Sequence, residues 1–197
     1  MLTAGSWATR APYPVNPSYQ SPRTVDLLRR ATADARYDEL RAGSQAVVRA
    51  VVAGGRLPPD WVRVDADGTV TAIPAPDGTG PAFGVDAARL PVRLAESCDP
   101  TDRAMATRLP SALVNRPDPA VGVSASDGQP LVDWRHPLAL IAGAAAAIDD
   151  RAAVGTLLDR ADDLNRKHPT YYAAAWAALG RLMLTTSRLG GCDQTAG

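Results

Sequence analysis

Carboxylates are the residues of this sequence with the greatest capacity for chemistry. Nineteen of the 21 acidic residues are aspartates, and Glu39 and Glu96 are the two glutamates. Asp86 is of interest because Arg89 follows it at a spacing of three, which places both side chains on one face of a helical turn. A cation there can hold a carboxylate ionised and oriented, as a proton acceptor requires. The same spacing suits a helix cap or a first-turn acid paired with Arg89, so the pattern alone leaves both interpretations open.

The cysteines and histidines do not form a metal-binding pattern. Cys98 and Cys192 lie far apart with no further ligand cluster beside them, and two histidines are too few for a typical zinc site. His136 and His168 each precede a proline, which favours a structural role at a helix start. We therefore expect neither a metal nor another cofactor.

Composition and charge restrict the partners. The 197 residues are 46% hydrophobic and carry a formal net charge of zero, so they offer no field that would attract nucleic acid or an acidic membrane. The most apolar run, 138–148, is about half the roughly 20 residues that span a bilayer. Residues 1–6 lack the basic residue and apolar core of a signal peptide, so we expect a cytoplasmic chain as written, or a secreted one if the true N-terminus lies upstream.

A single domain is expected over residues 1–197. Its first 22 residues contain four prolines, which predicts an extended arm without regular structure, and residues 190–197 are predicted to be a disordered tail. Alternating residues around Asp67-Gly68 predict a small β-hairpin over 61–73. Helices are predicted at 24–35, where Thr24 is the expected cap, at 38–53, at 83–96 and at 102–114.

Three more helices are predicted in the last third, at 136–150, 151–167 and 168–189. The middle one carries a single apolar stripe, so we expect it on the outside; the first is apolar all round and the last carries two adjacent stripes, so we expect both to be enclosed. Alternation of enclosed and one-faced helices suits concentric rings better than a four-helix bundle. The predicted fold class is all-α, an α/α barrel or part of one.

Four segments carry a resemblance to a known family. They are 16–22 (Asn-Pro-Ser-Tyr-Gln-Ser-Pro), 57–61 (Leu-Pro-Pro-Asp-Trp), 83–95 (Phe-Gly-Val-Asp-Ala-Ala-Arg-Leu-Pro-Val-Arg-Leu-Ala) and 171–181 (Tyr-Tyr-Ala-Ala-Ala-Trp-Ala-Ala-Leu-Gly-Arg). In this order they resemble the C-terminal half of glycoside hydrolase family 8, the bacterial endoglucanases and chitosanases, over nearly the whole chain. The resemblance implies an (α/α)6 toroid, here a partial one, whose open face holds a cleft for a β-1,4-linked polysaccharide.

The resemblance also implies catalytic roles. Inverting glycosidases need two carboxyl groups about 6.5 to 9.5 Å apart. In the family, the Asp of a Tyr-Asp-x-x-Arg motif is the general base in most members, which makes Asp86 the implied base and Arg89 its orienting partner, with Val85 in place of the Tyr. The family's general acid, a glutamate near the N-terminus of the complete enzyme, has no counterpart here. Glu96 is about 15 Å from Asp86 along a continuous helix, and we expect both Glu96 and Glu39 at the surface.

Aromatic side chains can stack on the apolar faces of sugar rings. The candidates are Tyr19, Trp61, Tyr171, Tyr172 and Trp176. We favour Tyr19, Tyr171 and Tyr172 as substrate-binding residues. Core packing is favoured for Trp176, and Trp61 and Asp60 are expected to fix the turn that opens the hairpin.

The expected function is hydrolysis of β-1,4-glycosidic bonds, in a cellulose-like glucan or chitosan, by a chain that lacks half of the catalytic pair. A start codon assigned too far downstream, a partner chain that supplies the N-terminal half, or decay of the gene would each explain this; we favour the first, because the resemblance begins within a few residues of Met1. The alternative is a non-catalytic carbohydrate-binding or helical interaction module whose exposed apolar helix faces dock a partner.

Overall fold

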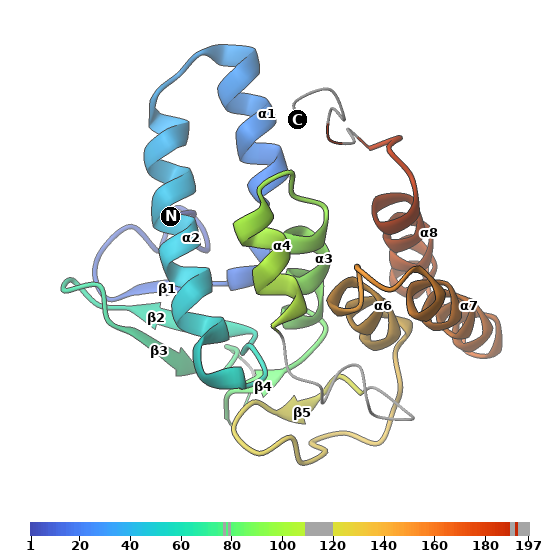
Figure 1. Ribbon diagram of the computed structural model, residues 1–197. Helices are drawn as coiled ribbons and strands as arrows, with labels where there is room; N and C mark the ends of the chain where they lie inside the picture. Colours follow the sequence, from blue (N-terminus) through green and yellow to red (C-terminus); the bar gives the residue numbers. More distant parts are fainter. Residues whose placement is uncertain (77, 79, 109–119, 190–191, 193–197) are drawn as a thin grey trace.

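The computed structural model describes residues 1–76, 78, 80–108, 120–189 and 192. Over these residues the chain is mainly helical with two small antiparallel sheets (Figure 1). The helices are α1 (Pro22–Thr32), α2 (Arg36–Val52), α3 (Leu90–Ala95), α4 (Pro100–Thr107), α6 (Pro137–Ala146), α7 (Arg151–Lys167) and α8 (Tyr171–Thr185), with short 3-10 turns η1 (Pro17–Tyr19), η2 (Ala53–Gly55) and η3 (Ala87–Arg89). The strands are β1 (Tyr13–Val15), β2 (Trp61–Val64), β3 (Val70–Ile73), β4 (Ala82–Phe83) and β5 (Val123–Ser124). The predicted helical fold class is confirmed.

The predicted hairpin is present and is extended by a third strand. β2 pairs with β3, and Gly68 adopts the positive φ of 87° that the tight turn between them requires. β1 pairs with the other edge of β2, with Val15 opposite Val62. The prediction that residues 1–22 lack regular structure is therefore wrong in part. Prolines are tolerated there because Pro14 lies in an edge strand and Pro17 in the first turn of η1.

The helix ends differ in detail from the prediction. α1 begins at Pro22, and its cap is Ser21, whose hydroxyl accepts the Thr24 N–H, so Thr24 is not the cap. α7 begins and ends as predicted, whereas α8 begins three residues after His168 and ends at Thr185. The second half of the helix predicted at 102–114 lies outside the described residues, as does the predicted tail at 190–197 apart from Cys192.

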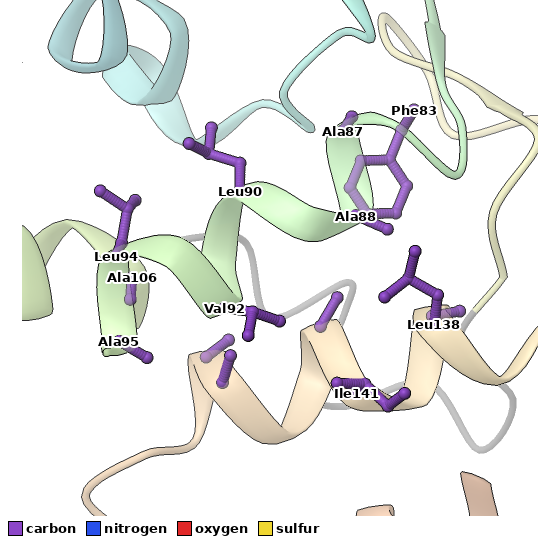
Figure 2. Packing of buried hydrophobic residues seen from close by; sticks show 14 of the residues in the cluster. Phe83, Ala87, Ala88, Leu90, Val92, Leu94, Ala95, Ala106, Leu138 and Ile141 are labelled. Carbon is purple, nitrogen blue, oxygen red and sulfur yellow. The ribbon is translucent and has the colours of Figure 1, made fainter. Parts of the chain in front are cut away.

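The core is built around α6. All ten of its residues are buried, which confirms the prediction that this helix is enclosed. Figure 2 shows Ala88 and Val92 pointing toward α6, where Leu138 lies, while Leu90 and Leu94 point away from it. The η3–α3 segment is therefore buried on two sides, with α6 on one side and further contacts from α1, η1, α4 and α8.

The last two helices differ in how far they are covered. α7 buries one stripe, Val154, Leu157, Leu158 and Ala161, so its predicted outer position is confirmed. α8 buries only Ala173, Trp176, Ala177 and Gly180, so its predicted enclosure is wrong for this chain. It packs against α6, α7 and α3, and Gly180 allows close approach to Ile141 of α6. Its outer side is exposed because the described residues supply no further helix to cover it.

A buried charge network joins α2 to the start of α4. Arg41 of α2 pairs with Asp102, whose carboxylate also accepts the Ser97 hydroxyl at 2.6 Å and the Gln45 amide at 3.3 Å. The Asp102 side chain has no exposed surface. We call Asp102, Arg41, Ser97 and Gln45 the Asp102 group. A carboxylate so completely paired and enclosed has a structural role.

A disulfide joins Cys98, beside this network, to Cys192 beyond α8. The two cysteines are 94 residues apart, and no spacing pattern in the sequence pairs them. Within the described part of the chain, none of the helices is long and apolar enough to cross a bilayer.

Candidate active site

Asp86 lies in the connection between β4 and η3, and its carboxylate is held by two donors. The Asn16 side-chain amide donates to Oδ2 at 2.8 Å, and Arg89 Nη2 donates to Oδ1 at 2.5 Å. Asp86 stands at the N-cap position of η3, but its side chain makes no capping hydrogen bond, so a capping role for the carboxylate is wrong, while the pairing with Arg89 is present. About a third of the side chain, 32%, is exposed. Asp86 is thus an oriented carboxylate that still reaches solvent.

Arg89 is itself held in place by η1. Its Nε and Nη2 donate to Ser18 Oγ at 3.1 and 2.8 Å, and Ser18 Oγ donates to Asn16 Oδ1 at 2.7 Å. We call Asp86, Arg89, Asn16 and Ser18 the Asp86 group. Asn16 and Ser18 are buried, so this end of the group is rigid. Both belong to the Asn-Pro-Ser-Tyr segment that carried the resemblance, yet the sequence did not show that their side chains contact Asp86 and Arg89.

The Tyr19 ring contacts Arg89. The Arg89 guanidinium carbon is 5.5 Å from the centre of the Tyr19 ring, within the range of a cation–π contact. The Trp61 ring packs edge-on against Tyr19 at 6.5 Å. Tyr19 remains 41% exposed. The structure therefore brings three predicted site residues together: Asp86, Arg89 and Tyr19.

Asp60 is a second carboxyl close to Asp86. Its Oδ1 accepts the Gly84 N–H at 3.0 Å and the Ala87 N–H at 2.7 Å. Burial raises the pKa of Asp60 from its ordinary value of 3.8 to about 6; the Ala87 N–H lowers it, and the negative charge of Asp86 raises it further. The expectation that Asp60 fixes the start of the hairpin is incomplete, because its side chain bonds to the segment that carries Asp86, 24 to 27 residues away.

The two other predicted tyrosines lie on α8, apart from these contacts. Tyr171 is 91% exposed. Tyr172 packs between the rings of His136, at 5.6 Å, and Trp176, at 6.4 Å. Trp176 is buried beneath the Arg93 guanidinium, which confirms the core role predicted for it.

Both histidines lie at helix termini, His136 at a helix start as predicted and His168 at the end of a helix rather than at a start. His136 Nδ1 accepts the Leu138 N–H at 3.1 Å and so caps α6. Burial lowers the pKa of His136, which keeps the ring neutral and that nitrogen available as an acceptor. His168 is the residue at which α7 ends. Among the residues described, no group of three His, Cys, Asp or Glu side chains could hold a metal ion.

The glutamates do not supply a second catalytic carboxyl. Glu39 is exposed in the first turn of α2, as expected. The Glu96 side chain is only 10% exposed and pairs with Arg93 at 3.1 Å, so its predicted place at the surface is wrong. Its other contact is the Ser21 hydroxyl at 3.3 Å, which Glu96 reaches because α1 packs against α3. Glu96 therefore accepts hydrogen bonds that tie α3 to the start of α1, which is a structural role.

This chain is similar to known proteins in its three-dimensional structure. The sequence matches none of the protein-family models, and none of the curated proteins either. The β-1,3-1,4-glucanase of Paenibacillus sp. X4 superimposes with a TM-score of 0.73 at 16% identity, over 93% of this chain and 53% of the glucanase. The endo-β-1,4-glucanase of Acetobacter xylinum superimposes with a TM-score of 0.63 at 26% identity, over 89% of this chain and 53% of that enzyme. A family 8 endoglucanase of Klebsiella pneumoniae superimposes with a TM-score of 0.63 at 19% identity, over 89% of this chain and 54% of the endoglucanase.

The chain spans about half the length of these solved structures. Its fold is that of a partial family 8 toroid, so the resemblance to glycoside hydrolase family 8 is confirmed at the level of the fold. The coverage is consistent with the C-terminal half that the four sequence segments indicated.

Proposed function

We propose that this chain provides the general-base half of an inverting β-1,4-glycanase active site, with Asp86 as the base. The observation that carries the proposal is the state of Asp86: its carboxylate is oriented by Asn16 and Arg89, takes no part in helix capping and is partly open to solvent. A carboxylate that only stabilised a helix end would bond to the amides of that helix. The proposed substrate is a cellulose-like glucan or chitosan.

The Asp86 group has the properties that a base requires. Two donors fix the plane of the carboxylate, and about a third of the side chain is exposed, so an oxygen lone pair can accept a proton from a water on the solvent side. Ser18 and Tyr19 hold the guanidinium in turn. Arg89 therefore orients the base, and the exposed Tyr19 ring beside it offers an apolar face to a sugar.

We propose that the general acid comes from outside the described residues. Inversion needs a second carboxyl about 6.5 to 9.5 Å from the base. Glu96 is paired with Arg93, and Asp60 accepts two backbone N–H groups. The other half of a toroid, as part of the same polypeptide or as a partner chain, is therefore a component of the proposed enzyme.

The test compares Asp86→Asn with the unaltered sequence in protein that contains the missing half, obtained from upstream coding sequence or by adding the partner chain. The amide is nearly isosteric but accepts no proton, so we expect kcat on carboxymethyl-cellulose or chitosan to fall by at least about 10²-fold while oligosaccharide affinity changes far less. Arg89→Lys should give an intermediate loss, since Lys keeps the charge without the planar fork.

Asp163→Asn is a matched control. Asp163 pairs with Arg166 at the same spacing of three, on the exposed face of α7. We expect this variant to leave kcat unchanged and to alter the free energy of unfolding by at most about 0.5 kcal/mol. If Asp86→Asn also leaves kcat unchanged, Asp86 is not the base.

A non-catalytic carbohydrate-binding or interaction module is the alternative, and the exposed side of α8 favours it for the chain by itself. Without an acid, we expect the 197-residue chain to hydrolyse carboxymethyl-cellulose very slowly or not at all, because a factor of about 10² to 10⁴ is lost. Calorimetric titration with cello-oligosaccharides measures whether it still binds. Robust turnover by this chain alone would show that the catalytic pair is misplaced.

We also propose that the protein works in an oxidising compartment, so that of the two locations considered, the secreted one is favoured. The support is the disulfide between Cys98 and Cys192, since such bonds persist mainly outside the reducing cytoplasm. Alkylation of native protein with and without prior reduction, followed by mass spectrometry, tests this. Two alkylated thiols without reduction would contradict it.

A further inference from the structure

The segment that carries Asp86 begins as a helical turn whose first residue lacks a capping side chain. The Ala88 N–H donates to the Gly84 carbonyl at 3.1 Å, which is the first intrahelical hydrogen bond of this turn. Gly84 is therefore the first residue of this turn, which leads into η3, and it stands where Ser, Thr, Asp or Asn would normally accept an N–H two or three residues further on. Glycine has no atom that can do this.

Asp60 supplies the missing cap from another part of the chain. Its Oδ1 accepts the Ala87 N–H at 2.7 Å, and Ala87 is the third residue after Gly84, the usual partner of a capping oxygen. The same oxygen accepts the Gly84 N–H at 3.0 Å. A Cβ built on Gly84 would collide with Asp60 Oδ2, so the carboxylate fills the space of the absent side chain.

The backbone fixes Asp60 at this place. The Asp60 N–H donates to the Ala82 carbonyl at 2.7 Å, and Trp61 then begins β2, the central strand of the three-stranded sheet. Asp60 thus ties the sheet to the turn 84–89. Because the turn is capped from outside, the Asp86 carboxylate, two residues after Gly84, is left to Asn16 and Arg89.

We infer that Asp60 is a positioning residue for Asp86: it caps the turn 84–89 in place of the side chain that Gly84 lacks, and so holds the Asp86 carboxylate against Asn16. The part of this inference that concerns catalysis rests on the proposed role of Asp86 as the base. The contact itself does not, and it can be tested in the 197-residue chain without any assay of activity. The raised pKa of Asp60 agrees with a carboxylate enclosed between two segments.

The experiment is hydrogen exchange and NMR on the isotopically labelled 197-residue chain and three variants. Asp60→Ala removes the acceptor, and Gly84→Ala pushes the carboxylate out, so in both we expect the Ala87 amide to exchange about tenfold faster or more, as for loss of a hydrogen bond to a charged acceptor. The resonance of the Asn16 side-chain amide, which reports its contact with Asp86, should shift in both. Asp60→Asn keeps an acceptor oxygen and should leave both signals close to those of the unaltered protein.

Buried amides of α7, such as that of Leu158, serve as the internal control for global stability and should exchange as before. A merely structural Asp60 would lower protection throughout the molecule and leave the Asn16 side-chain amide in place. Unchanged Ala87 exchange in Asp60→Ala, or an Asn16 signal that is the same in Asp60→Ala and Asp60→Asn, overturns the inference. If Asp60→Ala does not fold, Gly84→Ala against Asp60→Asn decides the same question.

The result separates the two proposals. Asp60 can prove to position Asp86 in this chain even if Asp86→Asn later leaves kcat unchanged, in which case only the catalytic role fails. Conversely, if Asp86 is the base but Ala87 and Asn16 do not respond to Asp60→Ala, only the positioning role fails. Where both proposals hold, Asp60→Ala in protein containing the missing half should lower kcat and change KM much less. Asp60→Asn in the same protein should keep most of the kcat of the unaltered sequence.

Discussion

The Asp86 group and the Asp102 group are built from the same four kinds of side chain and have different properties. Each has an aspartate bonded to an arginine, with a serine and a carboxamide completing the network. Asp102 has no exposed surface, and its partners occupy both carboxylate oxygens. Asp86 also has a donor on each oxygen, Asn16 on Oδ2 and Arg89 on Oδ1, but about one-third of its side chain is exposed. The same kinds of side chain thus form a fully enclosed ion pair and the partly exposed pair for which we propose a catalytic role, so enclosure rather than composition separates the two.

The reason is solvation. A fully enclosed carboxylate must have all its hydrogen bonds made inside the protein, and then neither water nor substrate can approach it. A carboxylate at the edge of the fold keeps a free lone pair that can take a proton. Substitutions in the two groups and beside them should therefore differ in their cost to the free energy of unfolding.

Asp102→Ala should be the most destabilising change. It leaves Ser97 and Gln45 without their enclosed acceptor and leaves Arg41 with the more exposed Asp26 and Asp99, each at 3.3 Å. The loss of unfolding free energy should therefore lie near the lower end of the range of about 3 to 5 kcal/mol for a broken buried pair. The matched change Asp86→Ala should cost about 1 kcal/mol or less, because Arg89 keeps Ser18 and Tyr19 and the site is partly hydrated. Urea denaturation of both variants measures the difference. Equal losses would mean that exposure does not distinguish the two groups.

Removal of the disulfide should have the second largest effect on the unfolding free energy. The double variant Cys98→Ser/Cys192→Ser opens a loop of 94 residues beside the Asp102 group and should lower the unfolding free energy by about 2 to 4 kcal/mol. Thermal unfolding with and without reductant checks this. Reductant should destabilise the unaltered protein and have no effect on the double variant.

The pH dependence of stability should report Asp60, beside the Asp86 group. Its folded pKa of about 6 lies above the ordinary value of 3.8, so between these pH values the folded protein binds more protons than the unfolded chain. Stability attributable to Asp60 is therefore highest below pH 4 and is lost as pH rises to about 6, by about 1 to 3 kcal/mol. Asp60→Asn should gain relative stability by this amount between pH 4 and 7. A difference between the two proteins that does not change with pH would contradict the raised pKa.

The smallest effect on stability is expected for Tyr171→Ala, since its side chain is exposed. The unfolding free energy should change by at most about 0.5 kcal/mol. If Tyr171 stacks on a sugar, oligosaccharide affinity should still fall, on the order of 2- to 10-fold. Tyr19→Ala is the comparison beside the Asp86 group, where loss of the ring also removes the Arg89 contact. Calorimetric titration of both variants with oligosaccharide shows whether the sugar contacts Tyr19, beside Asp86, or Tyr171 on α8.

The features that could be predicted from the sequence are those that depend on local patterns. Apolar periodicity predicted α6 as an enclosed helix and α7 as a one-faced helix, and Asp67-Gly68 predicted the turn between β2 and β3. These succeed because helix faces and tight turns are set by residues within a few positions of one another. The spacing of Asp86 and Arg89 is local in the same sense, and the pair is present.

Only the tertiary structure decided which carboxylate is structural and which is open. Asn16 and Asp86 are 70 residues apart, and Asp60 reaches Gly84 across 24, so no local pattern pairs them. Glu96 is enclosed because α1 packs against α3, whereas the outer side of α8 is exposed because nothing in the described chain covers it. Burial is a property of what packs against a residue, and for a partial toroid that depends on neighbours that the pattern of one helix cannot specify.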